Sequence, residues 1–502
     1  MKKYFLFLWL TPFCLLLFLS GAAQSKKSQP NIIYIYADDM GYGELGSYGQ
    51  KKIRTPHLDQ MAKEGMRFTQ HYSSAPVCAP SRCMLMTGKN PGHSYIRGNY
   101  ELGGFADYEE GGQMPLQEGA YTLAAMLKER GYHTALVGKW GMGVTGTTGS
   151  PLKQGFDYYY GYLDQKQAHN YYPTHLWEND HWDSLNNPII NVHTAIDPKT
   201  ATDADFEKYR GKDYAPAKMT EKALAFIDKN KHQPFFLYLP YTIPHLSLQA
   251  PEEYVKKYIG QFQEQPYYGD KGYAPNKYPL STYAAMITFL DDQVGIILDR
   301  IKKLGLDEHT IIMFSSDNGA TFSAGVDVNF FNSVSGLRGL KMDLYEGGIK
   351  VPFIARWPGK IKANTSSNIL SVQYDIMPTL AELTGKPVKK LDGVSLLPTL
   401  LGKENHQAAR EFMYFEYPEN GGQIAVRIGK WKGVKMNVLK NPLGNWELYD
   451  VEMDPLEKNN IAGANLSMIE KMKAIAVSQH LHPQVLEWEF IDPKIKKAAN
   501  LK

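Results

Sequence analysis

Two pairs of adjacent oxygen-donor residues in the sequence, three carboxylates and one amide in all, could hold a metal ion. Asp38 and Asp39 follow one apolar run, and Asp317 and Asn318 follow another. Carboxylate and amide oxygens are hard ligands, which favour Ca²⁺ or Mg²⁺ over Zn²⁺. Each doublet alone is also typical of a turn or a helix cap. The metal hypothesis therefore requires that the two doublets meet in space.

A pair of cysteines marks a second chemical motif, CAPSRC at 78–83. The chain has only three cysteines, and Cys78 and Cys83 are the two that follow the apolar amino terminus. In an oxidising compartment such a pair is ordinarily a disulfide. A spacing of five residues at the start of an expected helix makes this bridge sterically awkward, although the sequence does not exclude it. Cys78 therefore calls for another explanation.

The elements that must position these residues are strands alternating with helices. Short β-rich runs occur at 32–37, 134–137, 235–239, 311–314 and 351–355. Amphipathic spacing predicts helices at 124–130, 219–229 and 283–304. This alternation predicts an α/β fold, with a large mixed, mostly parallel sheet sandwiched by helices. In open α/β sheets ligands gather beyond the carboxyl ends of strands, so polar residues after four strands are expected to share one site.

The chain is predicted to divide into three parts. Residues 1–23 have the layout of a signal peptide, with two lysines, an apolar run and small residues, and a retained anchor is the alternative. Residues 24–400 are expected to form the catalytic α/β domain. Residues 401–502 are expected to form a C-terminal α+β subdomain with a small antiparallel sheet and a terminal helix. The segment 141–216 lacks periodicity and is predicted to decorate the site rather than enter the core.

Composition and the three cysteines exclude a disordered polyelectrolyte, a collagen-like repeat and a disulfide scaffold. The 502 residues are 43% hydrophobic and 21% charged, which is ordinary for a globular chain. A net charge of +3 gives no general attraction to nucleic acid, because phosphate binding needs a concentrated basic face. We expect an exported mature protein, periplasmic or secreted, with no nucleic-acid partner and no membrane segment.

The pattern CxPSR at 78–82, followed by Thr87 and Gly88, resembles the signature of the sulfatase family. In that family the cysteine is converted to formylglycine, an aldehyde whose hydrate is the nucleophile. The resemblance covers nearly the whole mature chain, through segments at 31–43, 242–245, 316–319, 339–352 and 446–457. It implies a formylglycine-dependent sulfuric ester hydrolase of alkaline phosphatase-like fold, similar to exported bacterial glycan sulfatases and to arylsulfatases.

The resemblance also implies roles for individual residues. Four oxygen ligands would hold Ca²⁺, or less favourably Mg²⁺, together with the modified Cys78: Asp38, Asp39, Asp317 and Asn318. Arg82 and Lys139 would orient the aldehyde hydrate and offset its negative charge. Lys341 and His245 would hold the sulfate oxygens, and His245 would protonate the departing sugar oxygen. A formylglycine-generating maturation enzyme is the implied partner. Without its motif either lysine would more often be a solvated charge, and a structural loop histidine is the alternative for His245.

One position departs from the family pattern. The family commonly has histidine two positions after the lysine of the GKW stretch at 138–140, where this chain has Gly141. His93, His169 and His175 are candidates for its proton-transfer role, with His169 the most suggestive. The favoured alternative is that all three merely contact substrate or solvent. Four residues are predicted to bind substrate: Lys341, His93, Arg97 and His169.

The substrate is predicted from the aromatic segment at 158–177. Its tyrosines and tryptophan could stack on sugar rings, although such clusters are equally ordinary packing material. The preferred substrate is a sulfated galactose or N-acetylgalactosamine unit of a glycan, attacked from a chain end. Two other functions stay open: a phosphatase or phosphonate hydrolase of the same superfamily, and a catalytically silent glycan-binding relative, which Gly141 would suit.

Overall fold

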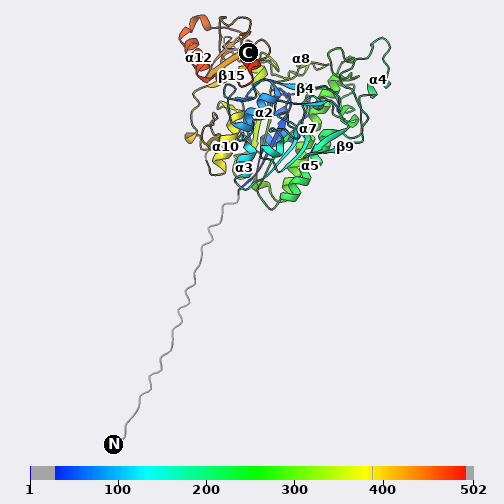
Figure 1. The fold of residues 1–502 in the computed structure, drawn as a ribbon, viewed down its shortest axis with the longest axis horizontal. Helices are drawn as coiled ribbons and strands as arrows, with labels where there is room; N and C mark the ends of the chain where they lie inside the picture. Colours follow the sequence, from blue (N-terminus) through cyan, green and yellow to red (C-terminus); the bar gives the residue numbers. More distant parts are fainter. Residues whose placement is uncertain (2–28, 387, 493–502) are drawn as a thin grey trace.

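The computed structural model describes Met1, residues 29–386 and residues 388–492 (Figure 1). Apart from Met1, the predicted signal peptide at 1–23 lies outside the described residues. Within the described part of the chain, no helix combines the length and the apolar character that a membrane crossing requires.

A ten-stranded mixed sheet forms the centre of the molecule. Its strands lie in the order β13 (Thr365–Ser367), β2 (Met66–Phe68), β12 (Phe353–Arg356), β11 (Thr310–Ser316), β1 (Asn31–Ala37), β10 (Phe235–Pro240), β6 (His133–Lys139), β7 (Tyr158–Tyr162), β8 (His175–Glu178), β9 (His181–Ser184). Strands β11, β1, β10, β6 and β7 are parallel, whereas β12, β8 and β9 pair antiparallel. The predicted α/β fold is confirmed, and all five predicted strands are present.

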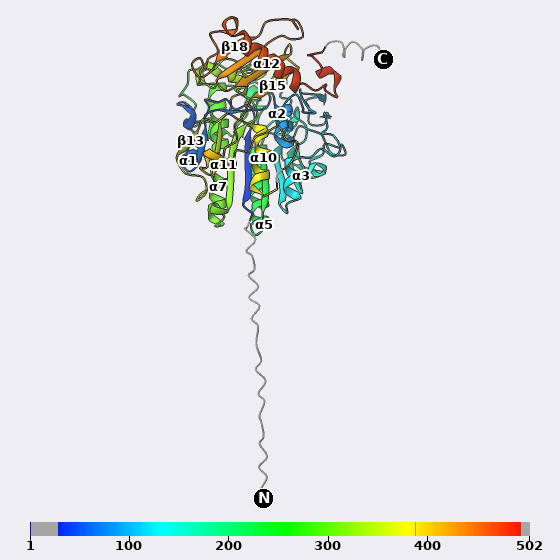
Figure 2. The same ribbon diagram turned by 90° about the vertical axis from the view of Figure 1, so that its left-hand side faces the viewer.

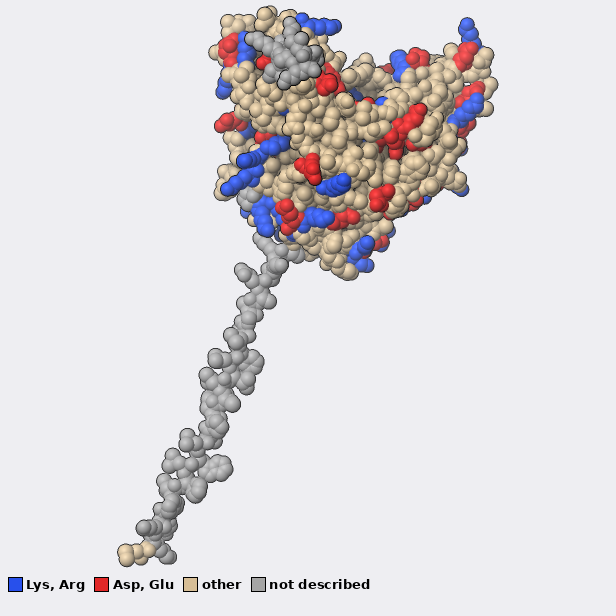
Figure 3. Space-filling view, in the orientation of Figure 1, with Lys and Arg blue, Asp and Glu red and all other residues tan. Residues whose placement is uncertain are grey.

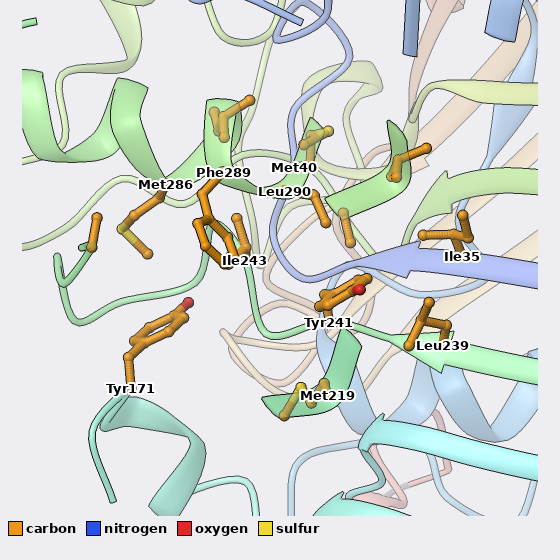
Figure 4. Close-up of a cluster of buried hydrophobic side chains, with 14 of the residues drawn as sticks. Ile35, Met40, Tyr171, Met219, Leu239, Tyr241, Ile243, Met286, Phe289 and Leu290 are labelled. Atoms are coloured by element: carbon orange, nitrogen blue, oxygen red, sulfur yellow. The ribbon is translucent and has the colours of Figure 1, made fainter. Parts of the chain in front are cut away.

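Strand β1 is buried along its whole length because helices cover both faces of the sheet (Figures 1 and 2). Alternate residues such as Ile35 share a core cluster with α5 (Ala215–Asn230) and α7 (Pro279–Lys303). Figure 4 shows Ile35 in this cluster, with Met286, Phe289 and Leu290 of α7. The residues between them, such as Tyr34, belong to a second cluster with α3 (Leu123–Lys128) and α10 (Ile376–Leu383). A continuous apolar strand is what a doubly covered parallel sheet requires.

Local signals set the ends of these helices. Thr122 accepts a hydrogen bond from the Ala125 amide and so caps α3, and Pro279 is the first residue of α7. Gly305, just past α7, has a φ of +68°, the left-handed geometry expected of a helix stop. The other α-helices of the described chain are α1 (Pro56–Lys63), α2 (Cys78–Thr87), α4 (Asp203–Glu207), α6 (Glu252–Val255), α8 (Val328–Phe331), α9 (Glu346–Ile349), α11 (Leu397–Leu400) and α12 (Leu466–Gln479).

The prediction that residues 141–216 stay outside the core is wrong in part. Strand β7 pairs in parallel with β6, and β8 and β9 extend the sheet to its edge. Tyr159, Tyr160 and Tyr171 in this segment are fully buried. The periodicity was hidden because tyrosine rings pack on both faces of β7, with Tyr159 in one core cluster and Tyr160 in the other. An alternation of apolar and polar residues cannot appear when both faces are packed.

A second, antiparallel sheet is formed by β15 (Met413–Tyr417), β16 (Gln423–Ile428), β17 (Trp431–Lys435) and β18 (Glu447–Asp450). Helix α12 packs on one face through Met472, while Tyr449 and Ala425 on the other face meet Leu344. In Figure 2 this sheet lies over the end of the central sheet at which β1 ends. Gln423 donates to the Met342 carbonyl at 2.8 Å. The C-terminal sheet therefore supports the loop that carries Lys341. Two-stranded pairs complete the sheets: β3 (His71–Tyr72) with β14 (Ser371–Val372), and β4 (Glu101–Gly103) with β5 (Glu110–Gln113).

Candidate active site

The two acidic doublets lie side by side at the carboxyl ends of neighbouring strands. The Asp317 amide donates to the Ala37 carbonyl at 3.1 Å, which joins the residues that follow β11 and β1. Asp39 has a φ of +66°, and its amide donates to Asp317 Oδ1 at 3.0 Å. A left-handed aspartate is uncommon and typical of functional loops. Because β1 and β11 are parallel neighbours, both doublets face one space.

Cys78 is the first residue of α2 and lies against this space. Its Sγ is 3.2 Å from Asp38 Oδ1, 3.8 Å from Asp39 Oδ1 and 3.7 Å from Lys341 Nζ. Cys78 and Cys83 are both free cysteines, so the disulfide alternative does not hold in this structure. Cys83 lies in the core among apolar side chains.

Arg82, one helical turn after Cys78, crosses the back of the site. Its Nε and Nη2 donate to Asp317 Oδ2 at 3.1 and 2.8 Å, and Nη1 donates to the Lys139 carbonyl at 2.9 Å. Residues four apart on a helix share a face, so α2 delivers both Cys78 and Arg82 to the same space. With every one of these contacts buried, Arg82 fixes Asp317 relative to the end of β6.

Two lysines complete the charge balance. Lys139 Nζ is 2.7 Å from Asp38 Oδ2, and Lys341 Nζ is 2.8 Å from Asp39 Oδ2. The Lys139 side chain is 1% exposed, whereas that of Lys341 is 15% exposed. Lys341 is therefore the more accessible of the two cations, and Lys139 is buried against Asp38.

His245 is buried beside the cluster. Its Nδ1 donates to the Leu246 carbonyl at 2.6 Å, and its Nε2 is 3.6 Å from Asp39 Oδ2. Burial and the Lys341 ammonium lower the pKa of His245 to about 4. The imidazole is thus neutral near pH 7, with the lone pair of Nε2 turned to the cluster.

Electrostatics around Cys78 follow from burial. Burial and the Asp38 carboxylate raise the pKa of the Cys78 thiol well above its usual range, so the unmodified side chain stays a neutral thiol. Burial opposes ionisation of Asp38, but Lys139 and Arg82 outweigh it and hold the pKa of Asp38 well below its usual range. Burial and Asp38 raise the pKa of Asp317 to about 7. The Asp317 carboxyl is thus only partly ionised near neutral pH unless a further cation lies beside it.

The donor set fits a hard cation. Asn318 donates through Nδ2 to Asp39 Oδ1 at 2.8 Å and to the Gly319 carbonyl at 2.9 Å. Its Oδ1 is buried and has no hydrogen-bond partner among the described residues. A buried amide oxygen without a partner is costly unless something accepts its lone pairs. Together with the three carboxylates, it makes an all-oxygen ligand set of the kind that Ca²⁺ and Mg²⁺ take.

An aromatic wall lies next to His245, and the sequence pointed to only one of its members. His169 stacks on His245 with ring centroids 5.0 Å apart. Phe105, His193 and Tyr273 in turn lie against His169, at 5.5, 5.2 and 5.2 Å. These three were missed because they come from separate loops with no motif of their own, and only the fold brings them to His169.

Other predicted residues are not brought to this cluster. Arg97 donates to four protein groups, which are the carbonyls of Ser94, Gly92 and Leu481 and the carboxylate of Glu416. All three guanidinium nitrogens of Arg97 are therefore engaged by the protein itself. His93 pairs with Asp392 at 2.9 Å, and His175 stacks on Trp182 at 4.0 Å. All three residues therefore contact other parts of the protein: His175 begins β8 at the edge of the sheet, and His93 and Arg97 lie in the segment after α2.

A larger residue at position 141 would require the neighbouring side chains to move. Its φ is +76°, and an added Cβ would lie 2.9 Å from Gln165 Cγ and 3.1 Å from Gln113 Oε1. The backbone angle would strain any larger residue here, and the two glutamine side chains would have to shift. Gln113 and Gln165 thus occupy the space beside Gly141.

Comparisons with known proteins match most of the chain. A family model described as Sulfatase matches residues 30–386, and one described as N-sulphoglucosamine sulphohydrolase, C-terminal, matches residues 340–487. The chain is 32% identical to an N-acetylgalactosamine-6-O-sulfatase of Bacteroides thetaiotaomicron, over 90% of this chain and 93% of the relative. It is 31% identical to human arylsulfatase A, over 92% of this chain and 89% of the relative. A solved structure of Ps i-CgsB in complex with k-i-k-neocarrahexaose aligns with a TM-score of 0.76 and 28% identity, covering 94% and 97% of the two chains.

Proposed function

The chain belongs to the sulfatase family, and from this premise we propose that it removes sulfate from galactose or N-acetylgalactosamine units at glycan chain ends, using Ca²⁺ and formylglycine at position 78. The observation that carries the proposal is the single space shared by Cys78 Sγ, Lys341 Nζ and the carboxylates of Asp38 and Asp39. The sugar is inferred from the name of the 32% identical relative and from the neocarrahexaose in complex with the aligned Ps i-CgsB.

Four side chains would hold the cation: Asp38, Asp39, Asp317 and Asn318. The partnerless Oδ1 of Asn318, within the described chain, is the feature that favours a bound ion most directly. Such an ion supplies positive charge to the oxygens of a sulfate ester. Three carboxylates and an amide oxygen are hard ligands, so Ca²⁺ fits these four side chains better than a transition metal does, with Cys78 and His245 also close to Asp38 and Asp39.

Position 78 supplies the nucleophile once its thiol has become an aldehyde and then a hydrate. The raised pKa of the Cys78 thiol explains why the unmodified residue is expected to be inactive. Cys78, Ser81 and Arg82 are buried in the folded chain, at 2%, 0% and 0% exposure. A maturation enzyme that reads this motif must therefore act before α2 packs.

The cations around position 78 divide the remaining work. Arg82 and Lys139 hold the carboxylates of Asp317 and Asp38 and keep positive charge beside residue 78. Lys341, the more exposed lysine, is placed to bind sulfate oxygens. His245 Nε2 faces the same cluster, so it is placed to exchange a proton with the leaving sugar oxygen. To act as the acid it must first gain a proton, which the negative charge of a bound sulfate favours.

The aromatic wall gives the sugar its own surface. Phe105, which is 40% exposed, and His193 form the outer part of the wall, with ring centroids 3.9 Å apart. Figure 3 shows the surface hollowed between the lobe that carries the C-terminal sheet and the lobe that extends to α4. Aromatic faces stack on the apolar faces of pyranose rings, and imidazole nitrogens bond to hydroxyls. We assign the sugar to this wall and the sulfate to Lys341.

The proposal includes export of the protein from the cytoplasm. The apolar amino terminus with its two lysines supports a signal peptide that ends after Ala23. Periplasmic or secreted location would be tested by amino-terminal sequencing of the mature protein, which is expected to begin near Gln24. A mature chain that keeps its first residues would contradict export by this route.

Mass spectrometry of the peptide that carries residue 78 tests the mechanism. Protein expressed together with a formylglycine-generating enzyme is expected to carry the aldehyde, and protein with only intact thiol is expected to be inactive. The same preparations are then assayed on sulfated galactose, sulfated N-acetylgalactosamine, a phosphate ester and a phosphonate ester. Sulfate release without phosphate release supports the proposal. Turnover by the intact thiol would overturn the nucleophile, and binding without turnover by the aldehyde form would indicate a silent relative.

A further inference from the structure

A second group of metal-binding side chains lies far from Cys78 in the sequence, directly after α12. His480 Nε2 is 3.2 Å from Glu489 Oε2, and His482 Nδ1 is 3.1 Å from the same oxygen. The three ligand atoms all lie within 4.8 Å of one another. We propose that His480, His482 and Glu489 bind a divalent transition-metal ion, with Zn²⁺ the best fit.

The distances from Glu489 to the two histidines suit zinc. Zinc bonds to imidazole nitrogen and carboxylate oxygen are about 2.0–2.2 Å long, so ligands at the corners of a tetrahedron are about 3.3 Å apart. The two separations from Glu489 Oε2, 3.2 Å to His480 Nε2 and 3.1 Å to His482 Nδ1, are close to that edge length. Two imidazoles and one carboxylate form a zinc set rather than a calcium set, because Ca²⁺ prefers oxygen ligands throughout.

Neighbouring groups hold the ligands ready. His480 Nδ1 is 2.8 Å from Glu416 Oε2, and a proton on Nδ1 leaves the lone pair of Nε2 free for a metal. A carboxylate behind a ligating histidine is the usual support in zinc sites. Glu416 is itself held by Arg97 at 2.7 Å and by the Tyr414 hydroxyl at 2.6 Å. The contacts of Glu416 with His480, Arg97 and Tyr414 are separate from the distances among the three ligands.

Glu489 is turned toward the two imidazoles by its own backbone contacts. Its Oε1 accepts hydrogen bonds from the amides of Ile491 and Asp492 at 2.9 and 2.8 Å, so Oε2 is the oxygen left for a metal. Glu489 is fully buried, whereas the His482 side chain is 59% exposed. His482 therefore provides the entry path, and solvent can supply a fourth ligand.

A similar group elsewhere in the molecule lacks these features. His57, Asp291 and Asp292 also place one ligand atom each within 4.8 Å of the others. Both oxygens of Asp291 accept backbone amides at the start of α1, from His57 at 3.0 Å and Leu58 at 2.7 Å. Since Asp291 already caps a helix, this group is not proposed as a site and offers a matched control.

The proposed ion would fix the conformation of residues 480–489, a segment that itself contacts the part of the chain that follows α2. Leu481, between the two histidines, donates its amide to the Gly92 carbonyl at 3.1 Å, and its carbonyl accepts from Arg97 at 2.7 Å. Metal binding is therefore expected to raise thermal stability and to leave sulfate release unchanged. The inference stands independently of the proposed function.

The experiment measures zinc bound by the full chain after removal of metals, in the presence of excess Ca²⁺ to fill the all-oxygen site. Wild-type protein and His57→Ala are expected to bind one more zinc ion than His482→Ala and Glu489→Gln. The wild-type protein with Co²⁺ is expected to show the visible absorption of a tetrahedral nitrogen and oxygen site, and His482→Ala is not. Zinc should raise the midpoint of thermal unfolding in wild type and His57→Ala only.

His482 is exposed, so its replacement is expected to leave a folded protein, which circular dichroism verifies. Equal zinc stoichiometry in wild type and His482→Ala would overturn the proposal. So would a loss of binding in His57→Ala that equals the loss in His482→Ala. Activity on a sulfate ester is recorded for each variant, and its absence in all of them would count against the proposed function without bearing on zinc binding.

Discussion

Two clusters of buried charge in this molecule are built from similar residues and do different work. Around Cys78, the carboxylates of Asp38 and Asp39 face Lys139 and Lys341. Beneath the C-terminal sheet, Glu346 faces Lys432 at 3.0 Å and Arg427 at 3.6 Å, and it accepts the Tyr72 hydroxyl at 2.7 Å. Both clusters are removed from water, so each must offset a large cost of burying charge.

The clusters differ in what they leave open. In the first, Asn318 Oδ1 has no partner among the described residues and the Lys341 side chain is 15% exposed. In the second, Lys432 is 1% exposed and also pairs with Glu457 at 3.0 Å. A closed network fixes packing, whereas an open one can receive a ligand. Burial alone therefore does not distinguish the two clusters, whereas the partly exposed cation of the first one does.

Replacing Cys78 should have the largest effect on activity and little on stability. Cys78→Ala removes the proposed nucleophile, so kcat for sulfate release should fall by more than about 10⁴-fold. The midpoint of thermal unfolding should change little, because no native ion pair is broken. Cys83→Ala is the matched control, since Cys83 is buried and free but lies in the apolar core. Retained activity in Cys78→Ala would mean that the open cluster acts without residue 78.

Replacing Lys432 should lower stability and change activity little, the opposite of replacing Cys78. Lys432→Met leaves Glu346 and Glu457 buried without their shared cation, which should lower the free energy of unfolding by about 3–5 kcal/mol. The folded fraction should keep kcat within about threefold of wild type, a small change beside those seen when a reacting group is removed. Lys430→Met is the control, because the pair of Lys430 with Asp450 lies at the surface, where water screens the attraction and the pair contributes little. Equal stability of the two variants in urea unfolding would show that the closed cluster contributes nothing to stability.

Replacing His245 separates proton transfer from sulfate binding. His245→Gln keeps a polar side chain but cannot transfer a proton, so kcat on a sugar sulfate should fall about 10²-fold. On nitrophenyl sulfate, whose leaving group needs no proton, the loss should stay below about tenfold. Equal losses on both substrates would assign His245 to sulfate binding instead.

Asp317 of the first cluster and Glu346 of the second should contribute to the pH dependence of stability with opposite signs. Without a cation, the pKa of Asp317 is raised from 3.8 to about 7, so the folded state binds more protons between these values. Stability then falls as pH rises through this range, by up to about 1.4 kcal/mol per pH unit, and Ca²⁺ should reverse the fall. Asp317→Asn should abolish this dependence on pH.

Glu346 gives the contrasting case. Burial opposes its ionisation, but Lys432 and Arg427 outweigh it and lower the pKa of Glu346 from 4.5 to about 2. Its contribution to stability is present above about pH 4.5 and is lost as pH falls through about 2. Urea unfolding of the chelator-treated protein across pH measures both effects, the one due to Asp317 and the one due to Glu346. A stability that does not change with Ca²⁺ at pH 8 would contradict the assignment of the open cluster.

Much of the fold could be predicted from local signals. The strand at 32–37 is present because a continuous apolar run suits a strand covered on both faces, and the helix at 283–304 ends before Gly305 as expected. Strand β7 was missed because tyrosines pack on both of its faces and erase the alternation. The site residues found from sequence were those in motifs, such as Cys78 and Asp317. Phe105 and His193 carry no such signal.

By itself, the sequence determined the chemistry available to this protein: hard oxygen ligands after two strands, a cysteine in a CxPSR motif, and cations in glycine-rich loops. Tertiary structure decided which of these residues meet. It joined Asp39 to Lys341 across 302 positions of sequence, placed His169 beside His245, and turned the donors of Arg97 to other protein groups. The reason is physical: residue type is local, whereas distance, burial and the count of unsatisfied donors and acceptors exist only once the strands are side by side.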